Sequence, residues 1–267
     1  MNLTATQHTH SSTPARSLSP WQAIALETSR YRLKTIDSFP DLIRVLELRS
    51  RLFSMEYGRV APPSGLDVDR FDFVADHLAI ECKESGEWIG TYRLISTRQS
   101  EEFYSGTEFE IDEFIRSPGS KLELGRACIH PDHRNGATLG LLWRGIVHYA
   151  KSSGIRYLFG CSSVKIRSRA ENDALLELWA TQDKVGDEWS ISPKSPYRFE
   201  EDDSGTSPDL SGIETPPLLR TYFKAGAKVY GSGAYDHEFE CVDFFTVLDL
   251  SQMEAGYGRR FSLQGNA

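Results

Sequence analysis

Apolar residues recur with two different periods along the chain, and these periods predict alternating helices and strands. Helical spacing marks residues 39–53, 139–150, 172–184 and 218–224, with a further short helix expected at 21–30. Short apolar or alternating runs predict strands at 31–36, 77–82, 88–96, 122–129, 155–162, 227–230 and 242–250. This order of elements predicts an α/β domain built on a mixed sheet.

Several of these elements have clear start or stop signals. Ser38 is a predicted helix N-cap with Pro40 in the first turn, and Gly58 ends that helix. Gly154 ends the helix that begins near residue 139. The turn 84–86 joins two strands into a predicted hairpin.

The domain is expected to span residues 21–250. Residues 1–20 are rich in Thr, Ser, His and Pro, with few large apolar side chains to offset the entropy of ordering, so we expect a disordered tail. Residues 186–216 hold many acids and prolines and predict a surface insertion. Residues 251–267 are expected to form a second tail.

Charge and cysteine content narrow the class of protein. The 267 residues carry a net charge of −8, which argues against general nucleic-acid binding because that task needs a dense basic surface. The four cysteines form no CxxC pair and follow no secretory segment, so we expect a reducing cytoplasmic location without disulfides. No run approaches the roughly 20 apolar residues that span a bilayer. Contact with the inner membrane is therefore expected to be peripheral at most.

The stretch 122–143 predicts a strand, a loop and a helix that contain the most informative polar residues. Glu123 and Arg126 are three positions apart, which places them on opposite faces of a regular strand. A bulge at Gly125 would turn both toward one cleft and splay this strand from its expected parallel neighbour at 155–162. Splayed strands leave backbone groups unpaired, and an amide-bearing arm such as pantetheine satisfies them.

The loop that follows this strand is a candidate anion site. Its amides lie at a helix N-terminus, where phosphate groups bind favourably. Many such turns bind nothing, so the loop alone is weak support. The loop residues are Arg134, Asn135, Gly136, Ala137 and Thr138.

Charged residues also occur on predicted inward faces. Arg49 shares a helix face with Phe53, and its alternatives are a site residue or an arginine whose stem covers the core. Arg93 lies on an inward strand face, and with Glu123 and Arg126 it either serves catalysis or forms a buried ion network with the Asp69 and Asp72 carboxylates.

The remaining polar candidates predict structural roles. Cys128 has no base beside it in sequence and is expected to be buried. His130 and His133 flank a turn without cysteine or acidic partners arranged nearby, so we expect no metal site.

Together these residues resemble a known family. The element order resembles the GNAT acyltransferase fold, and Arg134-Asn-Gly-Ala-Thr-Leu-Gly140 resembles a diluted form of its pyrophosphate loop. Arg49 with Phe53, Asp69-x-Phe71-Asp72, Gly90 with Arg93 and Glu123-Leu-Gly-Arg126 are similar to the signature of acyl-homoserine lactone synthases. The sequence between residues 31 and 250 as a whole resembles N-acyl amino acid synthases and ornithine acyl-ACP N-acyltransferases.

The resemblance implies an N-acyltransferase that moves a long-chain acyl group, with or without a 3-hydroxy group, to the amino group of an amino acid such as ornithine. Glu123 and Arg126 would be catalytic, with Glu123 as general base. Substrate binding would fall to Arg49, Phe53, Asp69, Asp72 and Arg93.

The diluted loop favours the acylated form of acyl carrier protein (acyl-ACP) over acyl-CoA as co-substrate. No permanently bound cofactor is expected. The acidic carrier would dock on cations near the loop, for which scattered surface charge is the alternative. These cations are Arg134, Arg144, Lys151, Arg156, Lys165, Arg167 and Arg169. The alternative functions are an acyl-homoserine lactone synthase and a non-catalytic module that binds acyl lipids or carrier protein.

Overall fold

The computed structural model describes residues 18–253, with gaps at 59, 167, 200–209 and 211. The predicted N-terminal tail lies outside the described residues up to residue 17, and the predicted C-terminal tail does so from residue 254. Within the described ranges, no helix combines the length and the apolar character that crossing a membrane requires.

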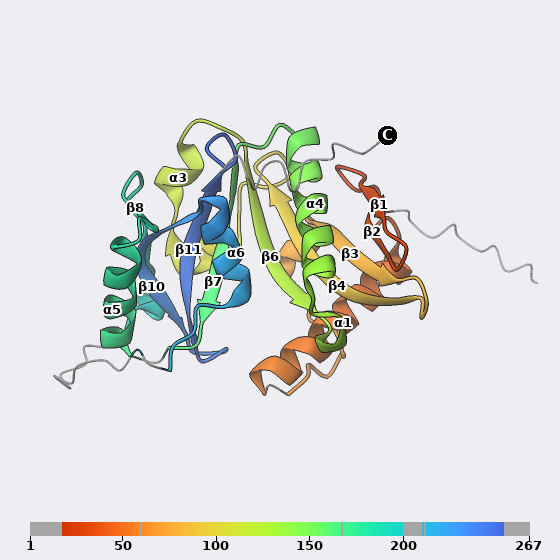
Figure 1. The fold of residues 1–267 in the computed structure, drawn as a ribbon, viewed down its shortest axis with the longest axis horizontal. Coiled ribbons are helices and arrows are strands. Elements are labelled where there is room, and N and C mark those ends of the chain that lie inside the picture. The colour runs from red at the N-terminus through yellow and green to blue at the C-terminus, as the bar shows by residue number, and fades with distance from the viewer. Residues whose placement is uncertain (1–17, 59, 167, 200–209, 211, 254–267) are drawn as a thin grey trace, which may run out of the picture.

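A mixed nine-stranded sheet forms the centre of the described chain (Figure 1). Most neighbouring strands are antiparallel, whereas the pairs β6–β7 and β8–β10 are parallel. In sheet order the strands are β1 (Ala25–Glu27), β2 (Tyr31–Thr35), β3 (Asp76–Cys82), β4 (Glu87–Ser96), β6 (Lys121–Ile129), β7 (Tyr157–Val164), β11 (Cys241–Asp249), β10 (Lys228–Asp236) and β8 (Val185–Gly186). A separate pair consists of β5 (Phe109–Glu110) and β9 (Ser192–Pro193). The predicted α/β class with a mixed sheet is confirmed.

Helices cover both faces of this sheet. One face packs against α4 (Gly136–Ser152), α5 (Arg169–Ala180) and α6 (Pro217–Ala225). The other face packs against α1 (Phe39–Tyr57) and the region of α2 (Ser105–Glu108) and α3 (Asp112–Arg116). Short 3-10 turns lie at Arg70–Phe73, Pro131–His133 and Ser195–Tyr197.

The boundaries of α1 follow the predicted signals. The side chain of Ser38 accepts a hydrogen bond from the backbone N–H of Asp41, and Gly58 ends the helix with φ of 65°. This φ lies in the left-handed region, which glycine adopts without a Cβ penalty.

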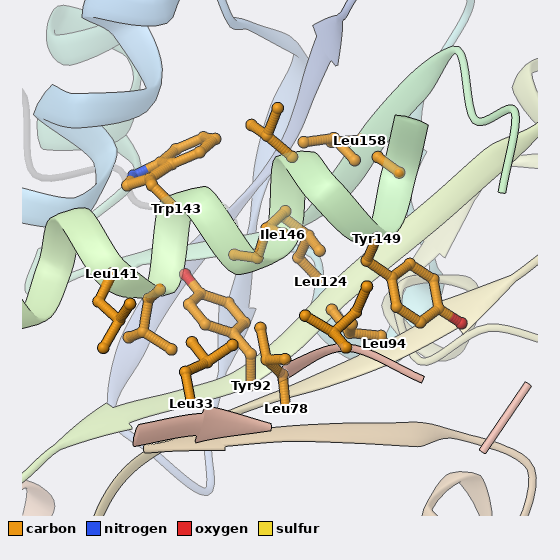
Figure 2. Close-up of a cluster of buried hydrophobic side chains, with 14 of the residues drawn as sticks. Leu33, Leu78, Tyr92, Leu94, Leu124, Leu141, Trp143, Ile146, Tyr149 and Leu158 are labelled. Carbon is orange, nitrogen blue, oxygen red and sulfur yellow. The ribbon is translucent and has the colours of Figure 1, made fainter. Parts of the chain in front are cut away.

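Helix α4 packs its apolar face onto the sheet, where residues such as Trp143 and Ile146 meet side chains of β2, β3, β4 and β6 (Figure 2). Gly145 allows this close contact, because a Cβ there would lie 2.8 Å from Leu33 Cδ2 and 2.9 Å from Leu78 Cδ2. The helix that follows the predicted anion loop is thereby held close to the sheet.

Strands β6 and β7 pair only at their beginnings. The register runs from Lys121 opposite Tyr157 to Glu123 opposite Phe159. Beyond this point β6 stays paired with β4 as far as Ile129, and β7 stays paired with β11 as far as Val164. The two strands therefore continue side by side without pairing to each other, which confirms the predicted splay.

The prediction about the start of the domain is wrong. Residues 21–30 contain strand β1, not a helix, because the Asp76 carboxylate accepts the N–H groups of Trp21 and Gln22 at 3.0 and 3.1 Å and holds the entry extended. The predicted surface insertion at 186–216 begins with residues that join the sheet and the core. Gly186 belongs to edge strand β8, and Ile191 is buried among aromatic side chains. Residues 200–209 and 211 of this segment lie outside the described chain.

Replacing Gly160 with alanine should destabilise the protein by about 1–3 kcal/mol, the usual cost of overpacking. A Cβ at Gly160 would lie 2.3 Å from the backbone oxygen of Leu124, at the point where β6 and β7 begin to diverge. Urea denaturation measures the change. Gly136→Ala is the matched control, because no atom lies within 4 Å of its added Cβ. Equal stability of Gly160→Ala and the wild type would contradict this close approach.

Candidate active site

A cavity of about 590 Å³ opens where β6 and β7 diverge. This volume is within the range of about 300–1,000 Å³ that is typical of small-molecule sites. Its lining includes residues of β6 from Glu123 to Ile129 and residues of β7 from Cys161 to Ser163. The cavity therefore passes through the sheet and reaches both faces.

The two ends of the cavity differ in polarity. On the face covered by α4 and α6 the walls include Leu139, Leu142 and Leu218, and the hydroxyls of Tyr92 and Tyr222 hydrogen-bond to each other. On the opposite face the walls carry the polar side chains Arg93, Ser105, Glu123, Arg126 and Asp243. A ligand with one apolar end and one charged end would match this difference in polarity.

A bulge in β6 determines where Arg126 points. Thr91 pairs with Cys128 and Arg93 pairs with Gly125, so Tyr92 of β4 faces two residues of β6. Arg126 occupies this extra position with φ of 50°, which is uncommon for a residue with a side chain. The bulge was predicted at Gly125, and the structure places it one residue later.

The bulge brings Glu123 and Arg126 to one face, as predicted. Both contact Tyr104: the Arg126 guanidinium lies over the Tyr104 ring at 4.7 Å, and Glu123 Oε2 accepts the Tyr104 N–H at 2.9 Å. Both residues also line the cavity.

Glu123 anchors the start of α2. Its Oε1 accepts the N–H and the hydroxyl of Ser105, both at 2.7 Å, and the residue is 2% exposed. Burial raises the pKa of Glu123, although the hydrogen bonds from Ser105 and Tyr104 lower it. Since both oxygens already accept hydrogen bonds, direct contact with a substrate amine is obstructed, and the role of general base stays a prediction.

A buried ion network connects three arginines to an aspartate-rich segment. Arg49 pairs with Asp67 and with Asp72, each at 2.6 Å. Arg93 pairs with Asp69 at 2.6 Å and with Asp72 at 3.4 Å. Arg126 reaches the same Asp69 at 3.0 Å. The network thus ties the bulge in β6 to helix α1 and strand β4.

The network contains part of the predicted substrate-binding set, for which substrate binding stays a prediction. Arg49 is 0% exposed, so it is a structural cation and not an arginine that reaches solvent. Arg49, Asp69 and Asp72 lie outside the described lining of the cavity, whereas Phe53 and Arg93 belong to it. Burial raises the pKa of Asp72, but the neighbouring Arg49 and Arg93 prevail and lower it to about 2.

The predicted phosphate loop is only partly open to a ligand. The Asn135 side chain caps α4 and accepts the N–H groups of Ala137 and Thr138 at 3.0 and 3.1 Å. Thr138 is 0% exposed, and neither Ala137 nor Thr138 is in the described lining of the cavity, so their role in phosphate binding stays a prediction. Arg134, Asn135 and Gly136 line the cavity.

Three of the seven predicted docking cations form ion pairs within the protein. Arg134 pairs with Glu56 at 2.5 Å, Arg156 with Asp249 at 3.0 Å and Arg169 with Asp173 at 3.7 Å. Arg167 lies outside the described chain.

Sequence reasoning missed a pair of neighbouring buried carboxyl groups, of which Asp243 lines the cavity and Glu108 does not. Glu108 is 0% exposed and Asp243 is 4% exposed. Burial and the Asp243 carboxylate raise the pKa of Glu108 to about 9, and burial raises the pKa of Asp243 to about 6. The available signal was Asp243 itself, an acid within an apolar strand sequence.

Comparison with known proteins agrees with this architecture. Residues 48–144 match the family described as acetyltransferase (GNAT) domain. The chain is 33% identical over 228 residues to an L-ornithine N(alpha)-acyltransferase of Rhizobium meliloti (strain 1021), with 79% of this chain and 77% of that protein covered. It is 29% identical over 238 residues to the Brucella abortus (strain 2308) protein of the same name, with coverages of 82% and 84%. A solved CoA-dependent acyl-homoserine lactone synthase, BjaI, aligns with a TM-score of 0.49, 15% identity and 85% coverage of each chain.

The fold and the cavity between its splayed strands define an acyltransferase of the GNAT class, which forms amide bonds. Within that class, the chain belongs to the L-ornithine N(alpha)-acyltransferase family. The family predicted from the residues is confirmed.

Asp72→Asn should cost about 3–5 kcal/mol of stability, because it leaves Arg49 and Arg93 buried beside a neutral side chain. The folded pKa of Asp72 is depressed to about 2 from an ordinary 3.8. Its contribution of about 2–3 kcal/mol is thus present above pH 4 and lost as the pH falls through 2. Denaturant unfolding at pH 7 measures the cost.

Asp112→Asn is the control for that measurement. Its salt bridge with Arg116 joins side chains that are 75% and 77% exposed, so we expect a change of about 0.5 kcal/mol or less. Similar losses in the two variants would contradict the buried network.

Glu108→Gln should stabilise the protein at pH 8 by at least about 1 kcal/mol, since one pKa unit corresponds to about 1.4 kcal/mol. The folded pKa of Glu108 is raised from 4.5 to about 9. The carboxyl group therefore stabilises the fold below pH 4.5 and loses that contribution as the pH rises through 9. Thermal unfolding of variant and wild type at pH 4 and pH 8 gives the difference. A gain of the same size at both pH values would refute the buried-acid explanation, and the exposed Glu101→Gln serves as control.

Proposed function

We propose that the protein transfers a long-chain acyl group, which can carry a 3-hydroxy group, from acyl carrier protein to the α-amino group of ornithine. The product would be an N-acyl ornithine, the lyso form of an ornithine lipid. The proposal rests on the family of the chain and on one observation: the cavity joins an apolar end to a polar end through the gap between β6 and β7.

The gap suits the phosphopantetheine arm of the donor. Beyond Glu123 and Phe159 the two strands do not pair with each other. Backbone donors and acceptors on their facing edges are therefore available to the amides of the arm. The thioester would then lie near the bulge, and the acyl chain would contact apolar walls.

The start of α4 favours a donor with a single phosphate. The Asn135 side chain already occupies the N–H groups of Ala137 and Thr138. A pyrophosphate would compete with this cap for the same donors, whereas the single phosphate of a carrier protein needs fewer of them. Carrier protein is therefore the proposed partner, and peripheral contact with the membrane stays a prediction.

The chemistry requires the acceptor amine to lose a proton as its nitrogen attacks the thioester carbonyl and the thiol leaves. Glu123 remains the proposed base, with the Ser105 hydroxyl as the route for the proton. That hydroxyl donates to Glu123 Oε1 at 2.7 Å, and Ser105 lines the cavity. Arg126 and Arg93 are the proposed partners of the acceptor carboxylate, because guanidinium groups bind carboxylates bidentately.

Glu123→Gln is expected to lower kcat by about 10²–10⁴-fold, the usual contribution of a general base. Purified protein is offered ornithine with a long-chain acyl-ACP or the matching acyl-CoA, and acyl-ornithine is quantified by mass spectrometry. The wild type should prefer acyl-ACP, and Glu101→Gln should match it. An unchanged kcat in a folded Glu123→Gln variant would exclude Glu123 as base. A preference for acyl-CoA would overturn the proposed donor.

A further inference from the structure

Two tyrosine hydroxyls meet in the apolar wall of the cavity. Tyr92 of β4 and Tyr222 of α6 both line it, and their hydroxyls hydrogen-bond to each other. Burial raises the pKa of both side chains, so both stay neutral at physiological pH. The bond ties α6 to the central sheet beside the cavity.

A second contact holds the Tyr222 ring in place. The Trp143 ring of α4 packs edge-on against it, with ring centroids 5.4 Å apart. Tyr92 and Trp143 belong to one apolar cluster around α4 (Figure 2). Because it is held from both α4 and β4, the Tyr222 ring forms a fixed part of the wall.

A smaller cavity, the rear pocket, adjoins the main cavity at Tyr222. Its volume is about 30 Å³, and it shares four lining residues with the main cavity: Leu124, Cys161, Ser162 and Tyr222. The Ser162 and Thr246 hydroxyls hydrogen-bond to each other at 2.9 Å. The other residues that line the rear pocket are mostly apolar: Trp143, Leu158, Phe159, Gly160, Ala227, Thr246 and Leu248.

The rear pocket suits the end of an alkyl chain. About 10–15 Å³ of such space holds one water-sized group, so the pocket has room for about two groups of that size. In the proposed function the thioester lies near the bulge, and Leu124, two residues before Arg126, lines both cavities. A chain that runs from the thioester along the apolar wall therefore meets the Tyr222 ring before the rear pocket.

We propose that Tyr222 sets the longest acyl chain that the enzyme accepts, because its ring closes the main cavity toward the rear pocket. This inference rests on the proposed function and adds a specificity-determining residue to it. Removing the ring would join the two cavities, so that longer chains could bury their ends. One methylene group that an apolar pocket accepts or rejects changes kcat/KM by about 10–200-fold.

A catalytic role of the Tyr222 hydroxyl is the alternative. The hydroxyl would then transfer its proton to the thiolate that leaves as the amide bond forms. Burial makes Tyr222 a weaker acid than a free tyrosine, and its partner Tyr92 is a second neutral hydroxyl. An acid is needed equally for every chain length, so the dependence on chain length separates the two roles.

The test measures kcat/KM with ornithine and a series of saturated acyl-ACP donors that lengthens by two methylene groups per step. Tyr222→Ala and the milder Tyr222→Leu should accept donors at least one step longer than the wild type does. On the first donor that the wild type rejects, the gain should be at least about tenfold. Tyr222→Phe keeps the ring and should keep the wild-type limit.

Phe223→Ala is the matched control. It removes a ring from the same helix, but Phe223 packs on Trp179 and lies outside the described lining of both cavities, so the limit should not change. Ala227→Val adds methyl groups to the rear pocket and, combined with Tyr222→Leu, should restore the wild-type limit. Circular dichroism checks that each variant is folded.

Two results would overturn the proposal. A folded Tyr222→Leu variant whose kcat falls equally on all donors, with the limit unchanged, would assign Tyr222 to the chemical step. A longer limit that Ala227→Val fails to reverse would show that the added chain does not enter the rear pocket.

Calorimetric titration of S-alkyl pantetheines, which contain no reactive thioester, gives a readout without turnover. Wild-type affinity should stop rising at a chain length that Tyr222→Leu exceeds by at least one step. This pattern in a protein that forms no acyl-ornithine would contradict only the proposed function. The same dependence on chain length in both proteins, or no binding by the wild type, would contradict the role of Tyr222.

Discussion

The bulge at Arg126 is the constraint on which the rest of the structure depends. It places a residue with a side chain at φ of 50° and turns its guanidinium to the face that already holds Glu123. Beyond Glu123, β6 no longer pairs with β7, and the cavity passes through this opening. Such backbone strain persists only where the surroundings determine it strongly. The Arg–Asp network holds Arg126 in this conformation, because Arg126, Arg93 and Arg49 all bind one short segment that contains three aspartates.

The arginine–aspartate network and the carboxyl pair of Glu108 and Asp243 use buried charge in opposite ways. In the network each aspartate has an arginine partner, so removing one side chain leaves an uncompensated charge. Among the described residues, Glu108 and Asp243 form no ion pair with an arginine, and burial raises the pKa of both carboxyl groups. Functional sites commonly retain such destabilising groups because ligand binding needs them.

Much of the fold was predictable from local patterns in the sequence. The boundaries of α1 followed from Ser38 and Gly58, and the parallel β6–β7 pair followed from the length of the connecting helix. The splay was predicted because Glu123 and Arg126 could share a face only if the strand were irregular between them. The exact bulge position was not predictable, since glycine at 125 was the stronger local signal and the arginine conformation depends on distant aspartates.

The site was predictable only where its residues are close in sequence or carry a family signature. Arg49 and Asp72 were assigned to substrate because a charge on an apolar face indicates a site or a buried ion pair, and sequence alone could not decide between them. Glu108 lies in a stretch that had no clear period, while Asp243 lies in a strand more than 130 residues later. Their meeting depends on the pairing of β7 with β11 and on the hydrogen bonds that hold α2 to Glu123, which no local pattern encodes.

Hydrogen exchange on the wild-type protein, with and without a long-chain acyl-ACP, tests the central claim most directly. If the donor arm lies between the splayed strands, amides of residues 124–128 in β6 and 160–164 in β7 will exchange more slowly when the donor is bound. Peptides from α5, on the same sheet face as α4, provide the internal reference. Protection confined to other segments, with exchange in these two strands unchanged, would contradict the account.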